Sequence, residues 1–149
     1  MSAPIRPARA QDHVAIRTLL AAHDLPVQDL ANPAIEFLVA ADDTRLLGVI
    51  GLEHCADAGL LRSLCVQGDL RGTGLGVARV DALVARARQA GLPQLVLLTQ
   101  TAAPFFSRRG YARIERAAAP AGVQVSAEFA SICPASATCM AKSLAGAAS

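Results

Sequence analysis

The sequence predicts an α/β fold in which helices flank a mixed central sheet of about six to seven strands. Apolar runs of strand length alternate along the chain with stretches of helical periodicity. Residues 95–99 are nearly all apolar, which is typical of a central strand that is buried on both faces. A chain of 149 residues suits one compact domain, so we expect a single domain over residues 1–149.

The N-terminal part predicts one strand and one helix. Residues 5–9 are expected to form the first short strand. Apolar residues then recur at helical spacing over residues 14–20, behind Asp12 as the predicted N-cap. Pro26 lies just behind this helix and limits it, because proline cannot continue a helix.

The next apolar runs predict three more strands. Residues 35–40 and 46–53 are separated by a short polar turn, and this arrangement predicts a β-hairpin. Residues 60–66 form the following strand, and residues 67–76 then make a polar, glycine-rich loop.

A long helix is predicted directly behind that loop. Its apolar face is expected to hold five residues, namely Val77, Val80, Leu83, Val84 and Ala87. Three arginines are expected outside that face, namely Arg79, Arg86 and Arg88. Gly91 and Pro93 then end the helix.

The C-terminal part continues the alternation of strands and helices. The predicted elements are a strand over residues 95–99, a helix over 102–109, a strand over 111–114 and a last strand over 137–144. Between the last two, residues 115–135 are irregular, with a helical turn expected over residues 127–132 behind Ser126.

Composition excludes several classes of protein. Apolar residues make up 53% of the chain and charged residues 17%, which argues against disorder. The net charge is only +2 and no stripe of basic and aromatic residues occurs, so no nucleic-acid partner is expected. No apolar run approaches the ~20 residues of a membrane span, and no signal peptide is evident. We therefore expect a cytoplasmic protein with reduced thiols and no membrane partner.

The loop at residues 67–76 is the stretch best suited to bind an anion. It leads from a strand into the first turn of a helix, where backbone N–H groups lack internal partners and lie at the positive end of the helix dipole. Its glycines let a phosphate approach the backbone, and Arg71 adds a positive charge.

Two common phosphate loops do not match this stretch. A Walker A loop requires Gly-Lys-Ser/Thr, which does not occur in the chain. A Rossmann fingerprint requires GxGxxG directly behind its strand and an acidic residue ~20 positions later. Here the glycines follow the pattern GxGxG, and residues 95–100 contain no acidic residue.

The remaining pattern is Arg-x-x-Gly-x-Gly behind a strand that ends in Leu-x-Val. With Arg71, Gly74 and Gly76 in this order, the chain resembles the GNAT superfamily of acyl-CoA-dependent acetyltransferases. The resemblance covers nearly the whole chain, from residues 5–8 to residues 105–111. It implies a sheet that splits into a V-shaped cleft, with acetyl-CoA as the cosubstrate.

The resemblance also implies which residues bind acetyl-CoA. Backbone groups at the end of one strand would face the pantetheine arm, namely those of Leu64, Cys65 and Val66. The pyrophosphate would be held by the loop and the first helical turn, namely by Arg71, Gly72, Thr73, Gly74, Leu75, Gly76 and Val77. Phe105 and Phe106 would pack beside the cofactor near the thioester.

Acetyl transfer requires a neutral amine, so a carboxylate base is expected, and a backbone N–H would stabilise the oxyanion. Glu53 is the first candidate base because it ends a strand near the expected cleft, although a solvated strand-end charge would explain it equally. Many GNAT enzymes carry a tyrosine acid on the late helix, where this chain has Phe106. Tyr111, the only tyrosine, is either a catalytic group or part of the core.

Three further residues are candidates for binding the substrate. Side chains alternate along a strand, so either Arg62 or Ser63 is expected to face the substrate, and Arg62 would bind a carboxylate or another oxyanion. Glu128 is a second acidic candidate in the irregular segment. The histidines show no metal-ligand spacing, so no metal is expected.

The second half of the chain is similar to one GNAT branch in particular. That branch is associated with bacterial arsenic-resistance gene clusters, and residues 61–64, 105–106, 128–129 and 133–134 carry the similarity. It implies acetylation of an arsenic-containing or amino-acid-like toxicant. Cys133 is either a ligand for arsenic or a buried structural cysteine.

Three functions remain open at this point. The preferred one is acetylation of the amine of a small molecule. A non-catalytic acyl-CoA-binding or sensing domain is suggested by Phe106 in the usual tyrosine position. A peptide or protein N-acetyltransferase would need an open groove. The sequence leaves open whether the protein forms a homodimer.

Overall fold

The computed structural model describes residues 5–23, 25, 27, 30–42, 45–56, 58–67, 75–100, 102–126, 129 and 137–144. Its strands are β1 (Ile5–Pro7), β2 (Ile35–Ala41), β3 (Leu46–Cys55), β4 (Ala58–Val66), β5 (Gln94–Thr99), β6 (Ala112–Arg113) and β7 (Thr138–Ser143). Its α-helices are α1 (His13–Ala22), α2 (Leu75–Gln89), α3 (Ala103–Arg108) and α4 (Ala121–Gln124). Single 3-10 turns occur at Ala10–Asp12 and Arg116–Ala118. No helix among these residues is long and apolar enough to span a bilayer.

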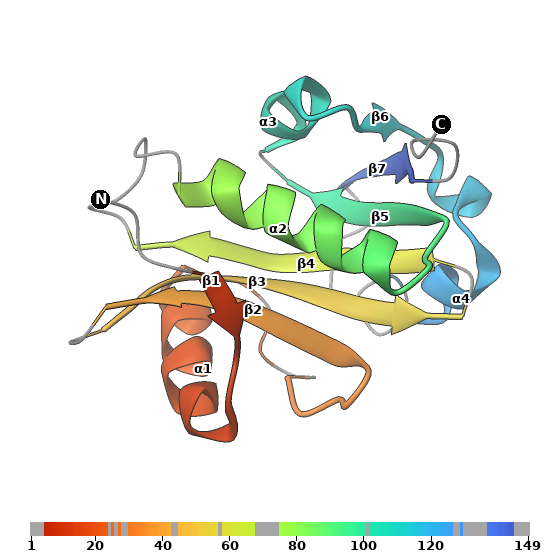
Figure 1. Ribbon diagram of the computed structural model, residues 1–149. Coiled ribbons are helices and arrows are strands. Elements are labelled where there is room, and N and C mark those ends of the chain that lie inside the picture. Colours follow the sequence, from red (N-terminus) through yellow and green to blue (C-terminus); the bar gives the residue numbers. More distant parts are fainter. Residues whose placement is uncertain are drawn as a thin grey trace.

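The strands form a mixed sheet. Within the described residues it has seven strands in the order β1-β2-β3-β4-β5-β7-β6 (Figure 1). Strands β4 and β5 are parallel, and all other neighbouring strands are antiparallel. The predicted α/β fold and the predicted β2–β3 hairpin are confirmed. The short helix α4 was not predicted, and the helical turn expected over residues 127–132 lies outside the described residues.

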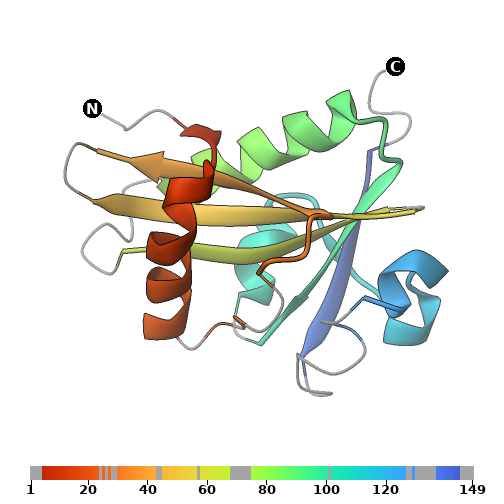
Figure 2. The same cartoon turned by 90° about the horizontal axis from the view of Figure 1, so that it is seen from below.

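Helices cover both faces of this sheet. On one face, α1 packs through Ile16, Leu19 and Leu20 against β2 and β3. On the other face, α2 and α3 pack against β3, β4 and β5 through a cluster that includes Leu83 and Phe106. Helix α4 lies on the α1 face, because Val123 belongs to the same buried cluster as Leu60, whereas the next residue of the strand, Leu61, belongs to the cluster on the α2 side. Figure 2 shows α1 and α2 on opposite sides of the strands.

The sheet splits between β4 and β5. These two strands pair only at Gly59 with Leu95 and at Leu60 with Val96. Beyond Leu60 the two strands run apart, and residues 61–66 of β4 have no partner on β5 (Figure 2). The edge of β4 that faces the split therefore carries backbone groups that no neighbouring strand of the described chain uses.

A β-bulge lies in β4 where the split begins. Val49 of β3 faces Cys65, whereas Gly51 faces Arg62, so β4 holds one more residue than β3 over this interval. Ser63 accommodates the extra residue with a φ of 60°, the only positive φ of a non-glycine residue in the described chain. A bulge bends the strand that carries it, which explains why β4 leaves β5 here.

Asp12 occupies the N-cap position of α1 as predicted, but its side chain makes no capping hydrogen bond to that helix. Its carboxylate accepts hydrogen bonds from Nη1 of Arg6 at 2.8 Å and from the backbone N–H of Arg9 at 2.7 Å. These bonds, led by the one from Arg6, lower the pKa of Asp12 to about 2. Asp12 thus connects the turn before α1 to β1 instead of satisfying the first N–H groups of the helix.

Candidate active site

Two candidate residues meet on β3 and β4, next to the split. Glu53 faces Leu60 and Gly51 faces Arg62 in the strand register, so Glu53 and Arg62 share one face of the sheet. Nη1 of Arg62 donates a hydrogen bond to Oε1 of Glu53 at 2.9 Å. The structure therefore joins two residues that the sequence suggested separately, as a base and as a substrate ligand.

This ion pair is buried. The side chain of Arg62 is fully buried and that of Glu53 is 7% exposed, which excludes a solvated strand-end charge for Glu53. Gly51 leaves room for the guanidinium stem, since a Cβ there would lie 3.2 Å from Cγ of Arg62. Because Glu53 already pairs with Arg62, a substrate oxyanion would share this guanidinium with Glu53, and the role of Arg62 in substrate binding stays a prediction.

Ser63 belongs to the same group of side chains. Nε of Arg62 donates to Oγ of Ser63 at 3.2 Å, so two successive residues of a strand point the same way. The prediction that only one of them faces the substrate assumed regular alternation, which the bulge at Ser63 interrupts. We call Glu53, Arg62 and Ser63 the bulge triad. A left-handed φ at a non-glycine residue costs ~1 kcal/mol, and such strain is concentrated at functional sites.

The end of β4 lies directly behind the bulge triad. The carbonyl oxygen of Cys65 is 2.9 Å from the position that a Cβ on Gly48 would take, so it points toward β3. Because the peptide unit is planar and trans, the N–H of Val66 points the opposite way, toward the edge that β5 leaves open. Leu64 packs into the core on the α2 side. The N–H of Val66 therefore lies on the edge of β4 where the contact with pantetheine is predicted.

The predicted pyrophosphate site is described only in part. Four of its residues lie outside the described residues, namely Arg71, Gly72, Thr73 and Gly74. Leu75 and Gly76 form the first turn of α2, and Val77 is half-buried behind them. The helix therefore begins where the prediction placed the N–H groups that would bind phosphate.

Arg79 is a residue whose position was predicted wrongly. The predicted apolar face of α2 does not include Arg79, yet its side chain is fully buried. Its Nη2 donates a hydrogen bond to the carbonyl oxygen of Cys65 at 3.1 Å. Burial lowers the pKa of Arg79 to about 10, so the side chain remains cationic at neutral pH. The available signal was its spacing of four residues from Leu83, which places both on one helix face.

The two phenylalanines of α3 contact each other edge to face, with ring centroids 5.1 Å apart. Phe106 is buried in the core, whereas Phe105 is half-buried at its margin. Of the two, Phe105 is thus the one that retains exposed surface for a cofactor.

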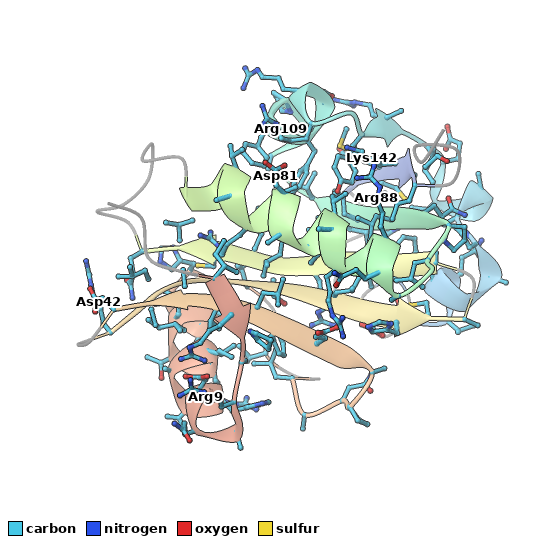
Figure 3. The ribbon with its side chains drawn as sticks, viewed as in Figure 1. Arg9, Asp42, Asp81, Arg88, Arg109 and Lys142 are labelled. Atoms are coloured by element: carbon cyan, nitrogen blue, oxygen red, sulfur yellow. The ribbon has the colours of Figure 1, made fainter. Side chains whose placement is uncertain are left out.

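Tyr111 packs on the far side of Phe106, with ring centroids 5.4 Å apart, and is 3% exposed. Burial raises its pKa well above the usual range. Nζ of Lys142 lies 5.6 Å from the centroid of the Tyr111 ring. Figure 3 labels Lys142 on β7, Arg109 at the end of α3, and Asp81 and Arg88 on α2. Tyr111 belongs to the core on the α2 face, opposite the face of Glu53, so the structure favours core packing over catalysis.

Two candidates lie outside the described residues, namely Glu128 and Cys133. Within the described part of the chain, no group of three or more His, Cys, Asp or Glu side chains is placed to hold a metal ion.

The chain resembles N-acetylglutamate synthase from Neisseria gonorrhoeae complexed with coenzyme A and N-acetyl-glutamate, with a TM-score of 0.79 and 20% identity over 97% of this chain. The chain spans only 35% of that protein's length. Rv2747 from Mycobacterium tuberculosis, in complex with CoA and NLQ, gives a TM-score of 0.78 and 26% identity over 95% of this chain and 99% of that one.

A third similar structure is the ribosomal-protein-S18-alanine N-acetyltransferase from Escherichia coli, with a TM-score of 0.71 and 15% identity over 94% of this chain and 92% of that one. No curated protein sequence matches the chain. The family model described as an acetyltransferase (GNAT) domain matches residues 10–126, which is most of the sequence. The chain therefore belongs to the GNAT family of acetyltransferases.

Proposed function

We propose that the chain transfers the acetyl group of acetyl-CoA to the amine of a small, amino-acid-like molecule. The observation that carries the proposal is the split between β4 and β5, which leaves the backbone edge of residues 61–66 open next to the bulge triad. Support comes from the similar structures, two of which contain CoA.

In this proposal, acetyl-CoA lies along the open edge of β4. The N–H of Val66 and the neighbouring backbone of Leu64 would bind the pantetheine arm. Arg71 and the N–H groups of residues 72–77 would bind the pyrophosphate at the start of α2. Phe105 would cover the cofactor from the side of α3. The residues assigned to the cofactor thus lie at the end of β4 and at the start of α2, and Arg79 links these two elements.

The bulge triad would supply the chemistry. Glu53 would accept the proton of the attacking amine, directly or through water, and Arg62 would hold Glu53 in place. The amine nitrogen would bond to the thioester carbon, the oxyanion would be stabilised by a backbone N–H at the bulge, and the C–S bond would break. The CoA thiolate would take its proton from water, since a thiol pKa of ~8.5 makes it a fair leaving group without a tyrosine acid.

The choice of acceptor rests on two kinds of support. One similar structure contains N-acetyl-glutamate, which favours an amino-acid-like amine. The resemblance of residues 61–64 and 105–106 to the arsenic-resistance branch favours an arsenic-containing member of that class. Cytoplasmic acetyl-CoA would then be the donor. The similarity to a protein-alanine acetyltransferase makes a peptide N-terminus the second candidate acceptor.

The proposal is tested by thiol release from acetyl-CoA with a panel of free amino acids, arsenic-containing analogues and short peptides. We expect turnover with at least one free amine, and a loss of ~10²–10⁴-fold in kcat for Glu53→Gln, as for removal of a catalytic base. Glu36→Gln is the matched control, because Glu36 lies on the adjacent strand and forms a more exposed ion pair with Arg86.

Three outcomes would redirect this assignment. CoA binding without turnover for any amine would favour a non-catalytic sensing domain. Preference for peptides over free amino acids would favour the protein acetyltransferase. Full activity in Glu53→Gln would remove Glu53 as the base and leave it as the partner of Arg62.

A further inference from the structure

Arg79 connects three elements that border the proposed acetyl-CoA site. It projects from the second turn of α2 and is fully buried. Its Nη2 donates to the carbonyl oxygen of Cys65, the last residue but one of β4, at 3.1 Å. This hydrogen bond joins the start of α2 to the end of β4, the two elements that residues 67–74 connect along the chain. It therefore links both ends of the proposed pyrophosphate loop.

Gly48 of β3 is the matching feature on the sheet. A Cβ at this position would lie 2.7 Å from both Cζ and Nη1 of Arg79 and 2.9 Å from the carbonyl oxygen of Cys65. Cβ atoms do not approach other heavy atoms so closely, so only glycine lets the guanidinium lie over β3 and reach Cys65. Gly48 and Arg79 thus form a complementary pair on separate elements.

The hydrogen bond also reinforces the direction of a peptide plane that pairing with β3 sets, because Val49 faces Cys65 and Gly48 faces Val66. Arg79 binds the carbonyl oxygen of Cys65 on the side of β3. The N–H of Val66 belongs to the same planar peptide and points to the open edge of β4. A rotation of this peptide would remove that N–H from the split, and Arg79 resists the rotation together with the pairing to β3.

Simple core packing does not account for this residue. Burial of a guanidinium disfavours its charge, as the lowered pKa shows, and a leucine or methionine would fill the same space without that cost. What the guanidinium of Arg79 adds over an apolar side chain is a charged donor for the carbonyl oxygen of Cys65.

We propose that Arg79 is a positioning residue for acetyl-CoA, which holds the first turns of α2 and the Cys65–Val66 peptide at the spacing that the cofactor requires. The inference rests on the proposed function, because it assumes that acetyl-CoA binds along β4 and at the start of α2. Arg79 itself touches neither the substrate nor the thioester.

The test measures CoA binding by calorimetry for the wild type, Arg79→Met, Arg79→Lys and Gly48→Ala, with Arg86→Met as the control. Arg86 lies on the same helix but is exposed and paired with Glu36. We expect Arg79→Met to weaken CoA binding by about tenfold or more, as for loss of a charge-assisted hydrogen bond, and Arg86→Met to leave it unchanged. Arg79→Lys, which keeps the charge without the fork, should fall between them.

Gly48→Ala perturbs the same contact without altering Arg79. Its Cβ should displace the guanidinium from Cys65 and weaken CoA binding in the same direction. Because both changes break one interaction, their effects in the double variant should be less than additive. In turnover assays with the best amine of the panel, KM for acetyl-CoA should rise, while kcat and KM for the amine stay within about twofold.

Each outcome bears on one claim. If the wild type does not bind CoA, the proposed function fails, and this inference fails with it. If the wild type binds CoA and folded Arg79→Met binds it equally well, Arg79 is not a positioning residue. Equal losses in CoA affinity, amine KM and kcat would also overturn the proposal, because they indicate general disruption. If Arg79→Met does not fold, Arg79→Lys and Gly48→Ala decide the matter by the same criteria.

Discussion

At the scale of single residues, Arg62 and Glu53 depend on each other for compensation of their buried charges. Both side chains are buried, and the distance between Nη1 and Oε1 is 2.9 Å. Removing charges from water costs several kcal/mol, which mutual attraction offsets only while both partners are present. The ion pair holds Arg62 in place, and Nε of Arg62 in turn donates a hydrogen bond that orients the Ser63 hydroxyl.

This coupling predicts an unusual pattern of stability. Arg62→Met should lower the free energy of unfolding by about 3 kcal/mol or more, because it leaves a buried carboxylate without a partner. Adding Glu53→Leu should restore most of that loss, because no charge then remains buried. Urea unfolding measures both values. Arg86→Met, which breaks an exposed pair with Glu36, should cost under ~1 kcal/mol. If the double variant is no more stable than Arg62→Met, the burial argument is wrong.

At the scale of elements, apolar periodicity was sufficient to place the strands and helices near their observed positions. Gly91, with a φ of 77°, follows α2 as predicted. The errors concern residues whose partners lie elsewhere in the sequence. Asp12 binds Arg6 on β1, and Arg79 reaches Cys65 on β4. A periodic pattern describes one element at a time and carries no information about such partners.

The bulge in β4 is a second feature that periodicity misses, because an extra residue is defined only relative to the paired strand. Ser63 has a φ of 60°, where glycine is strained least. Ser63→Gly should therefore be more stable than Ser63→Ala by ~1 kcal/mol in urea unfolding, although both lose the bond to Arg62. At Thr138, a regular position in β7, alanine should instead be more stable than glycine. The same order at both positions would contradict the strained backbone.

At the scale of the whole molecule, the Arg-x-x-Gly-x-Gly motif was enough to indicate the family, which the match over residues 10–126 confirms. The order of elements along the chain did not reveal which residues share a face. Glu53 and Arg62 meet because β3 and β4 are antiparallel and their regular register here places both residues on one face, where Gly51 faces Arg62 and Glu53 faces Leu60. Tyr111 lies on the other side because α3 turns it into the core under α2. Strand β7 inserts between β5 and β6, so the last strand in sequence is not at an edge.

The split between β4 and β5 predicts which backbone amides exchange more slowly when CoA is bound. The N–H of Val66 faces the split and has no strand partner on β5, so a ligand bound there would protect it from exchange. CoA should therefore slow hydrogen–deuterium exchange in peptides that cover residues 61–67 and the first turn of α2. Peptides from β1 and β2, at the far end of the sheet from the split, should not change.

The double variant Arg71→Glu with Gly74→Asp should keep the exchange pattern of the free protein and lose the response to CoA, because it places carboxylates where the pyrophosphate would bind. A response confined to β1 and β2, or a full response in this variant, would place the cofactor elsewhere in the fold.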